Sequence, residues 1–338
     1  MIMCLFAVSV SAADFDKTEK VTVTLSDGST QECALYDENG NELVWYTLDQ
    51  GATVISVKAD DLVYSSTTDL RSISLSDGTP LQKDNEVTTN HIVVANLRGR
   101  TFTHLVHNGY KSTFDNSKII QYVYLPSTIT SLACNQYQNC TNLKVLDFPS
   151  DARFSFDDSN FAPGCTSLNK SIGLEKSTTT RIGKHMFNKT AITEVRLPNT
   201  LTNIGEAAFN SCKSLKVAYL GASATTFEIN GGFNASDAFN SSGIEVVYMP
   251  STITAVAGYA FSNANSLRAV IYTGTKQQAM DMYNASSTIN NSPFVNLGKT
   301  ESQFISWEEY SALADNPTVP GFCTVPFSGT APPELAPA

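Results

Sequence analysis

The chain has 338 residues, of which 42% are hydrophobic and 16% are charged, and its formal net charge is -10 at pH 7. This hydrophobic content excludes a disordered acidic chain, and the length allows about two ordinary domains or one elongated array of repeats. The negative charge, together with the lack of any lysine- or arginine-rich run, excludes a nucleic-acid-binding protein.

The first 13 residues have the composition of a secretory signal peptide. An apolar run from Met1 to Val10 precedes Ser11-Ala12-Ala13, and small residues of this kind suit a signal peptidase. The usual basic residues before the run are missing, which fits a start further upstream; a buried N-terminal strand is the alternative. No other stretch reaches the roughly 18 apolar residues of a membrane span. The sequence therefore predicts an extracellular or cell-surface protein with no membrane span.

Residues 14–90 are predicted to form a small β domain. Apolar and polar residues alternate, as in residues 21–25 (VTVTL), which is the pattern of a half-buried strand. Three dipeptides that favour tight hairpin turns lie between such runs: Asp27-Gly28, Asn39-Gly40 and Asp77-Gly78. Residues 91–118 are predicted to cap the repeats that follow, because an open end of a repeat array exposes apolar surface.

One pattern recurs between Ile120 and Leu267. It begins L-x-x-V-x-L-P, continues T-I-T-x-I-x-x-x-A-F and ends N-x-C-x-S-L. Repeats start at Ile120, Leu143, Leu168, Ile192, Leu215, Ile244 and Leu267, with strides of 23, 25, 24, 23, 29 and 23 residues. Strides of roughly 20–29 residues are those of leucine-rich repeats. The sequence therefore predicts a mainly β leucine-rich-repeat solenoid over residues 119–275, with an insertion at residues 228–236.

Each repeat has apolar positions for three sides of a coil. L-x-x-V-x-L predicts a short strand whose Leu, Val and Leu face the core, and the proline after it ends the strand. The β-branched T-I-T-x-I segment predicts a second extended stretch. The A-F pair is expected on a turn or a one-turn helix, with its aromatic ring inserted between coils, since one repeat buries its apolar face only by stacking on another.

Three of the seven cysteines occupy one position of the repeat. Cys140, Cys165 and Cys212 each lie three residues before the next repeat start. A small, weakly polar side chain suits a tight inner turn. We expect free buried thiols, with a disulfide between successive coils as the alternative. No cysteine belongs to a C-x-x-C pair, and neither a zinc site nor any other cofactor is predicted.

The segment from Leu197 to Leu215, LPNTLTNIGEAAFNSCKSL, resembles the repeat of BspA-like surface proteins. These are leucine-rich-repeat proteins of host-associated bacteria and of some parasitic protists. The resemblance covers residues 119–275 and weakens at 143–192, where Gly173-Leu174-Glu175 replaces V-x-L-P. It implies a secreted or surface-attached protein that adheres to host matrix proteins or to other cells. The motif fixes no binding residue.

The end of the chain is predicted to form a helical C-terminal cap over residues 276–316, followed by a proline-rich tail at 317–338. Lys276 to Tyr283 and Trp307 to Ala314 look helical, and Ser306 with Glu309 has the spacing of a capping box.

No recognisable catalytic or metal-binding motif is present. His104 and His107 form an H-x-x-H without a third ligand, and ordinary surface or cap histidines are the favoured interpretation. Asp157-Asp158 is interpreted as a solvated turn and not as a calcium site. No nucleophile elbow, zinc-protease or phosphate-loop motif occurs. The sequence predicts a protein that is not an enzyme; a glycan-acting site in residues 14–118 is the remote alternative.

The candidate binding surface is the outward side of the first strand of each repeat. The residues that alternate with the core positions are Tyr122 and Tyr124, Val145 and Asp147, Glu194 and Arg196, Val217 and Tyr219, Val246 and Tyr248, and Ala269 and Ile271. Stacked coils align them into a stripe, and tyrosine is a preferred contact residue at interfaces. Aromatic and β-branched residues also favour strands for packing alone. The residues predicted to bind ligand are Tyr122, Tyr124, Glu194, Arg196, Tyr219 and Tyr248.

The leading hypothesis is a monomeric adhesion module that recognises a protein or a glycan of a host or neighbouring cell through this stripe. The alternative is a structural spacer that presents residues 14–118 or another domain. Ligand binding that maps wholly to residues 14–118 would favour the spacer.

Overall fold

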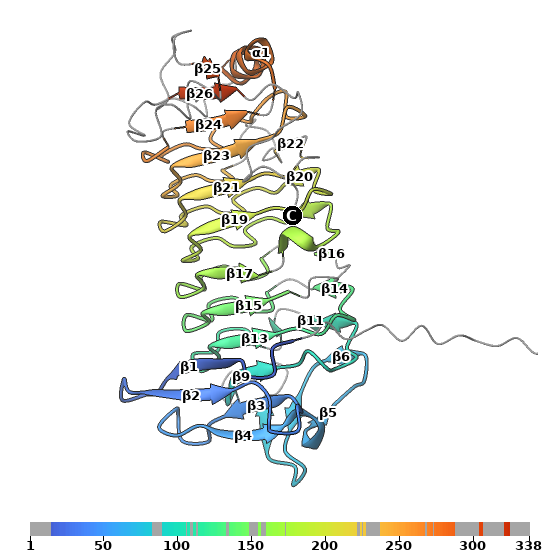
Figure 1. The fold of residues 1–338 in the computed structure, drawn as a ribbon. Coiled ribbons are helices and arrows are strands. Elements are labelled where there is room, and N and C mark those ends of the chain that lie inside the picture. Colours follow the sequence, from blue (N-terminus) through green and yellow to red (C-terminus); the bar gives the residue numbers. More distant parts are fainter. Residues whose placement is uncertain are drawn as a thin grey trace, which may run out of the picture.

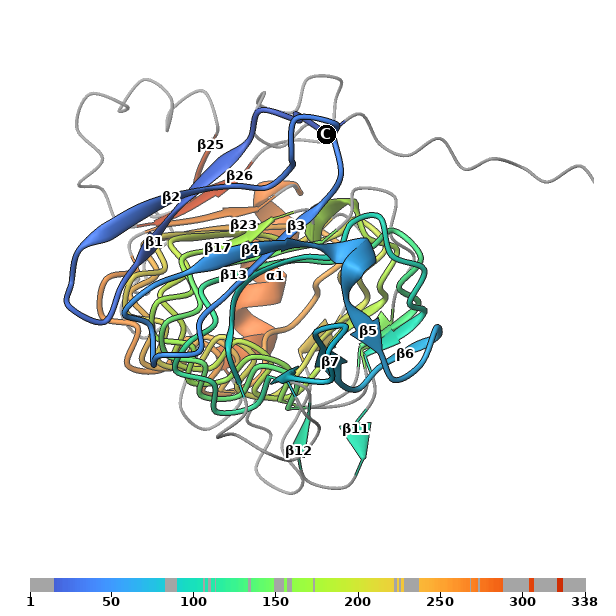
Figure 2. The ribbon, with the colours of Figure 1, turned by 90° about the horizontal axis from the view of Figure 1, so that it is seen from below.

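The computed structural model describes residues 15–82, 90–105, 107–108, 111–112, 114–132, 135–148, 155–156, 160–172, 174–221, 224, 226–227, 237–267, 269–272, 274–287, 304–306 and 321–324. These residues are mainly β, as predicted, and include a single α-helix. Short strands lie above one another in columns along one long axis (Figure 1). Seen along this axis, the successive coils superpose around a common interior (Figure 2).

Antiparallel hairpins precede the repeats. Their strands are β1 (Lys20–Thr24), β2 (Thr30–Ala34), β3 (Leu43–Tyr46), β4 (Ile55–Lys58), β5 (Val63–Tyr64), β7 (Ile73–Ser74) and β8 (Pro80–Gln82), with a 3-10 turn, η1, at Ala59–Asp61. Strand β6 (Asp69–Leu70) lies between β5 and β7 in the chain and belongs to a parallel column described below. β1 pairs with β2, β3 with β4, and β7 with β5 and β8. The glycines of the three predicted turns, Gly28, Gly40 and Gly78, all have positive φ, as tight hairpin turns require. The predicted hairpin turns are therefore confirmed.

The first strands of the repeats pair in parallel and form what we call the first sheet. It consists of two ladders: β9 (Ile92–Asn96), β13 (Tyr122–Tyr124), β15 (Val145–Asp147) and β17 (Lys170–Ile172), then β19 (Glu194–Arg196), β21 (Val217–Tyr219), β23 (Val246–Met249) and β24 (Ala269–Tyr272). β3 and β4 extend the first ladder at one end. β26 (Gly321–Thr324) and β25 (Phe304–Ser306) extend the second ladder at the other end. The strands predicted from L-x-x-V-x-L are confirmed.

Several of the T-I-T-x-I segments form a second column of two-residue strands, as predicted, whereas the segment at Thr252–Thr254 forms no strand. β6, β10 (His104–Leu105), β14 (Ser131–Leu132) and β16 (Ser155–Phe156) pair in parallel, and so do β18 (Arg181–Ile182), β20 (Asn203–Ile204) and β22 (Thr226–Phe227). A small antiparallel pair, β11 (His107–Asn108) and β12 (Lys111–Ser112), follows β10.

The A-F segments lie on turns, as predicted, and build the third side. The backbone N–H of Phe209 donates to the carbonyl of Ala238 at 2.7 Å, and that of Phe239 donates to Ala260 at 2.7 Å. The rings of Phe187, Phe209, Phe239 and Phe261 form a continuous stack, with centroid distances of 5.6, 5.2 and 5.2 Å between neighbours. All four rings are fully buried. In these four coils the aromatic side chain therefore packs on that of the next coil, which gives the A-F position of the repeat a structural role.

The coil of residues 168–192 interrupts the backbone pairing of the first sheet and of the second column of strands, but not that of the A-F turns. Within the described residues, no backbone pairing joins β17 to β19 or β16 to β18. The turn side continues, because Asn160 N–H donates to the Lys184 carbonyl at 2.7 Å. A 3-10 turn, η3 (Leu174–Lys176), stands where the repeat pattern would end its strand with V-x-L-P. The sequence and the backbone thus depart from the repeat in the same coil.

One hydrophobic core extends from Val44 in β3 to Tyr283 in the helix α1 (Lys276–Ser287). The first sheet and this core both continue across residue 90, so the domain boundary placed there stays a prediction. The helix α1 confirms the first predicted helix of the C-terminal region. No helix in the described part of the chain has the length and apolar character needed to cross a membrane.

The prediction of a tail at residues 317–338 is wrong for Gly321–Thr324. These residues form β26, which pairs in parallel with β24 along Ala269–Tyr272. The prolines Pro332, Pro333 and Pro337 led to the interpretation of a proline-rich tail, but the sequence of residues 321–324 contains residues that favour strands. Strand β26 pairs with the backbone groups of β24 that would otherwise form an open sheet edge.

Some predictions concern residues outside the described part. They are the signal peptide at residues 1–13, the insertion at 228–236, the Asp157-Asp158 turn, and the second C-terminal helix at 307–314. Ser306, its predicted N-cap, is the last residue of β25.

Candidate binding surface

The outer face of the first sheet points away from the core. Along β19, Glu194 and Arg196 are exposed and Val195 between them is buried. The parallel register aligns Arg196 with Tyr219, and Tyr219 with Tyr248. Stacking therefore brings predicted residues from three successive coils into one row, as alternation along strands requires.

The hairpin of β1 and β2 lies across the outer face at β9 and β13 (Figure 2). Val21 and Val23 belong to a small hydrophobic cluster that includes Val93, Val94 and Tyr124 and is separate from the main core. Because the hairpin buries apolar side chains on this side too, β9 is buried along its whole length. This part of the sheet is an interior layer and not a surface.

Polar groups also hold the hairpin on the sheet. The Gln121 side-chain amide donates to the carbonyl of Thr24 at 2.7 Å, and its oxygen accepts from the Thr24 N–H at 2.9 Å. The Tyr122 hydroxyl donates to the carbonyl of Thr22 at 2.8 Å. The Lys144 ammonium donates to the same carbonyl at 3.3 Å and to the Thr24 hydroxyl at 3.0 Å. Side chains of the sheet thus bind the backbone of an extended strand.

The prediction of an open stripe is wrong at Tyr124, which is only 3% exposed. Tyr122 is partly covered, since its hydroxyl is bonded to the hairpin. Further along the stripe, Asp147, Val246, Ala269 and Ile271 are buried as well. Alternation decides which face a side chain points to, whereas a segment remote in sequence decides whether that face is covered.

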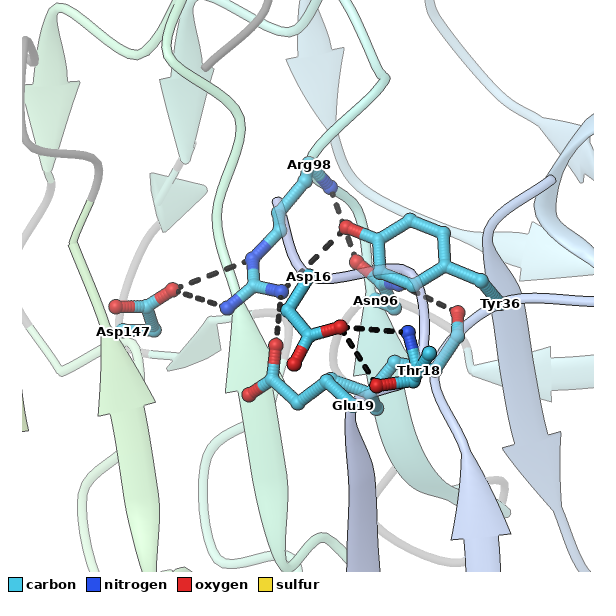
Figure 3. Close-up of polar contacts among 8 residues, drawn as sticks. Asp16, Thr18, Glu19, Tyr36, Asn96, Arg98 and Asp147 are labelled. Carbon is cyan, nitrogen blue, oxygen red and sulfur yellow. Dashed lines mark hydrogen bonds and ion pairs between the residues drawn. The ribbon is translucent and has the colours of Figure 1, made fainter. Parts of the chain in front are cut away.

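Arg98, in the turn after β9, connects the hairpin to the repeats (Figure 3). Its guanidinium donates to Glu19 at 2.8 Å and to Asp147 at 2.8 and 3.3 Å. It also lies 4.2 Å from the ring centroid of Tyr124 and 4.5 Å from that of Phe15. Figure 3 shows Asp147, from β15, and Glu19, from the hairpin, approaching the guanidinium from different sides. One cation therefore joins two carboxylates from segments far apart in sequence.

Burial controls the protonation of this cluster. Burial opposes the charge of Arg98, but hydrogen bonds to Glu19 and Asp147 outweigh it, and the pKa of the guanidinium is raised. Burial also raises the pKa of Asp147, and the contact with Arg98 offsets only part of that effect. The carboxylate thus stays ionised at neutral pH only at a desolvation cost, which makes it dependent on its cation.

A second part of the outer face is open, and we call it the outer-face patch. It consists of Glu194, Arg196, Lys216, Tyr219, Glu245 and Tyr248, from β19, β21 and β23 and the residues just before them. The Tyr219 and Tyr248 rings stack at a centroid distance of 4.4 Å and an interplanar angle of 8°. The Arg196 guanidinium lies 3.8 Å from the Tyr219 centroid, and its Nε donates to Glu194 at 2.6 Å. Side chains of three successive strands therefore contact one another in the patch without a ligand.

The stack covers Tyr219 on both sides. Because β19 and β23 flank β21, Arg196 and Tyr248 lie against opposite faces of the Tyr219 ring. Just before β21 and β23, Lys216 pairs with Glu245 at 2.8 Å. The patch combines a planar stack with two charge pairs, and it offers recognition chemistry and no nucleophile with an adjacent base.

The three repeat cysteines are free and buried, as predicted. The Cys140 thiol donates to the carbonyl of Phe114 at 2.8 Å, and the Cys165 thiol to that of Tyr137 at 2.8 Å. The Cys212 thiol reaches the carbonyl of Phe187 at 3.0 Å. In each case the acceptor belongs to the preceding coil. Burial raises the pKa of Cys140 and Cys212, so these thiols join coils and are poor nucleophiles.

The histidine motif does not assemble a metal site among the described residues. His104 is about half exposed, and its Nδ1 lies 3.6 Å from Asp69. The side chain of His107 lies outside the described part. No group of three or more histidine, cysteine, aspartate or glutamate side chains that suits a metal ion occurs where side chains are described.

The repeat matches a known family. The model of the BspA type leucine rich repeat region matches in six copies, over residues 94–173, 155–268 and 232–306, which together exceed half of the chain. The chain belongs to this family. A comparison with curated proteins finds no match.

Two solved structures are similar to this BspA-type chain. One is a leucine rich cell surface protein from Faecalibacterium prausnitzii A2-165, with 19% identity and a TM-score of 0.35, over 54% of this chain and 49% of that one. The other is a leucine-rich repeat protein from Bacteroides ovatus, with 15% identity and a TM-score of 0.30, over 70% of this chain and 71% of that one. The BspA-type chain thus spans about half the length of the first.

The six predicted ligand-binding residues of the BspA-type chain fall into two groups. Tyr122 and Tyr124 contact the hairpin, whereas Glu194, Arg196, Tyr219 and Tyr248 lie together in the outer-face patch. Their role in binding stays a prediction. Sequence reasoning missed Lys216 and Glu245, although both directly follow the first apolar residue of a repeat, and that shared position was the available signal.

Proposed function

We propose that the chain is a secreted or cell-surface binding module, a leucine-rich-repeat solenoid whose outer-face patch recognises a protein or a glycan. The observation that carries this proposal is the fixed arrangement of Arg196, Tyr219 and Tyr248 on an open part of the sheet. Aromatic and arginine side chains dominate the energetics of binding surfaces. Because they are already ordered, little side-chain entropy remains to be lost on binding.

The other parts of the chain fit this role. Family membership supports it, as does the signal-like composition of residues 1–13. The segments before and after the repeats act as caps, since β3 and β4 extend the first sheet at one end and β26 extends it at the other. Caps of this kind keep apolar repeat ends away from solvent and leave the outer-face patch as the surface for a monomer to present.

Binding of the full chain to arrays of extracellular matrix proteins and glycans tests the proposal. The variant carries Arg196→Ser, Tyr219→Ser and Tyr248→Ser together. The matched control carries Leu48→Ser and Val63→Ser, which are 53% and 54% exposed and lie in the hairpin region before the repeats. We expect at least a tenfold loss of affinity in the triple variant and none in the control, with circular dichroism and melting temperature showing that both proteins are folded.

Binding that survives in the folded triple variant contradicts a role for the patch. Binding that instead falls with substitutions in residues 15–82 favours a spacer that presents this region. Removing residues 15–118 is unsuitable as a test, because the first sheet and the hydrophobic core continue through that segment.

A further inference from the structure

The outer-face patch repeats the groups with which the sheet holds its own hairpin. Lys144 and Lys216 both directly follow the first leucine of a repeat, and Lys144 binds the Thr22 carbonyl and the Thr24 hydroxyl of β1. Tyr124 and Tyr219 occupy the same repeat position. The covered site and the open patch therefore use a lysine and a tyrosine from the same two repeat positions, although Lys144 lies one coil beyond Tyr124 and Lys216 lies in the same coil as Tyr219.

A cation that lies near a tyrosine ring and bonds a carboxylate recurs as well, although Arg98 lies in the turn after β9 and Arg196 lies within β19. Arg98 lies 4.2 Å from the ring centroid of Tyr124 and is bonded to a carboxylate of the sheet, Asp147. Arg196 lies 3.8 Å from the ring centroid of Tyr219 and is bonded to Glu194. In the covered site, the hairpin adds a second carboxylate, from Glu19, to the cation. The patch has the cation, and a ligand would supply the second carboxylate.

The geometry of the stack disfavours a sugar ring packed against Tyr219. An aromatic side chain holds a sugar through an open ring face, and both faces of Tyr219 are occupied by Arg196 and Tyr248. An extended peptide needs no open ring face. On the covered site, β1 is held through its backbone by Gln121, Tyr122 and Lys144, while its valines pack on the sheet.

We propose that the outer-face patch binds an extended segment of a partner protein, laid across β19, β21 and β23 as β1 is laid across β9 and β13. This rests on the proposed function and names its ligand class. The segment has an acidic residue that bonds Arg196 and β-branched residues at alternate positions that face the patch. Glu19, Val21 and Val23 have this spacing in the hairpin. Lys216 donates to a backbone carbonyl of the segment, as Lys144 does to Thr22.

A display library of random linear 12-residue peptides, panned against the full chain, tests the proposal. The Arg196→Ser, Lys216→Ser variant serves for counter-selection, and the Leu48→Ser, Val63→Ser variant is the matched control. We expect enriched peptides with an acidic residue followed by alternating β-branched residues, and at least a tenfold weaker affinity for the patch variant.

The outcomes separate this proposal from the function on which it rests. Glycans that bind the chain and lose affinity in the patch variant, with no peptide enriched, overturn the peptide proposal and leave the patch as a binding surface. The peptide proposal is also overturned if enriched peptides bind the patch variant and the control variant equally, or if they bind only as helices. If matrix proteins, glycans and peptides all ignore the patch substitutions in folded protein, both proposals fail.

Discussion

Replacing Arg98 by methionine is expected to lower the free energy of unfolding by about 3–5 kcal/mol, because it strands a buried carboxylate. The Asp147 side chain is only 13% exposed and loses a cation that bonds it at 2.8 Å. Glu19 is 33% exposed and its lost pair adds about 1 kcal/mol or less. Methionine keeps an apolar stem between Phe15 and Tyr124, so most of the loss comes from the charge.

Urea unfolding followed by circular dichroism measures the change. Arg196→Met is the matched control, since Arg196 also contacts a tyrosine ring and a carboxylate but is 42% exposed. Exposed pairs of this kind contribute about 0–1 kcal/mol. The double variant Arg98→Met, Asp147→Leu removes both charges and should recover at least half of the loss, because no uncompensated carboxylate remains.

Two results would refute this reasoning. One is a loss in Arg98→Met that is no larger than the loss in Arg196→Met, since burial would then have no effect. The other is a double variant as unstable as Arg98→Met alone, which would place the loss in packing and not in the stranded charge of Asp147.

Three further changes follow from contacts in the fold. Phe209→Ala removes one ring from the buried stack and should destabilise by about 3–5 kcal/mol in urea unfolding. Hydrogen bonds from Asn41 and Thr47 lower the pKa of Asp37 and Asp49 to about 2, so their stabilisation is present above about pH 4 and is lost as pH falls towards 2; Asp49→Asn should flatten this loss in acid titrations. The buried Cys165 should escape alkylation in native protein and react only in urea, as mass spectrometry of its peptide would show.

Local pattern was sufficient to predict the repeating parts of the fold. The apolar spacing of Ile192, Val195 and Leu197 places these side chains in the core, and all three are buried. The position of Cys212 within the repeat predicted a buried free thiol for the same reason. Each of these features depends on neighbours within one repeat or on the equivalent residue in the next. The repeat pattern and its length are therefore enough to predict them.

The covered part of the candidate site depends on contacts that no repeat encodes. Tyr124 has the same repeat position as Tyr219. Strand β1, about 100 residues earlier in the chain, buries Tyr124, whereas Tyr219 stays partly exposed. Arg98 gave no signal because its partners, Glu19 and Asp147, lie 79 and 49 residues away. Strand β26 was missed for a related reason, since its pairing with β24 satisfies an edge that only the assembled sheet presents.

The interruption at residues 168–192 lies between the two halves of the outer face. The hairpin covers strands of the first ladder, and the outer-face patch lies on the second ladder, with no backbone pairing between β17 and β19 among the described residues. Arg98 and Arg196 share no hydrogen-bonding partner. Effects at sites without shared partners usually add within about 0.5 kcal/mol. Arg98→Met should therefore leave ligand affinity at the patch unchanged in protein that is still folded, and a tenfold change in that affinity would show that the ladders are coupled through the core.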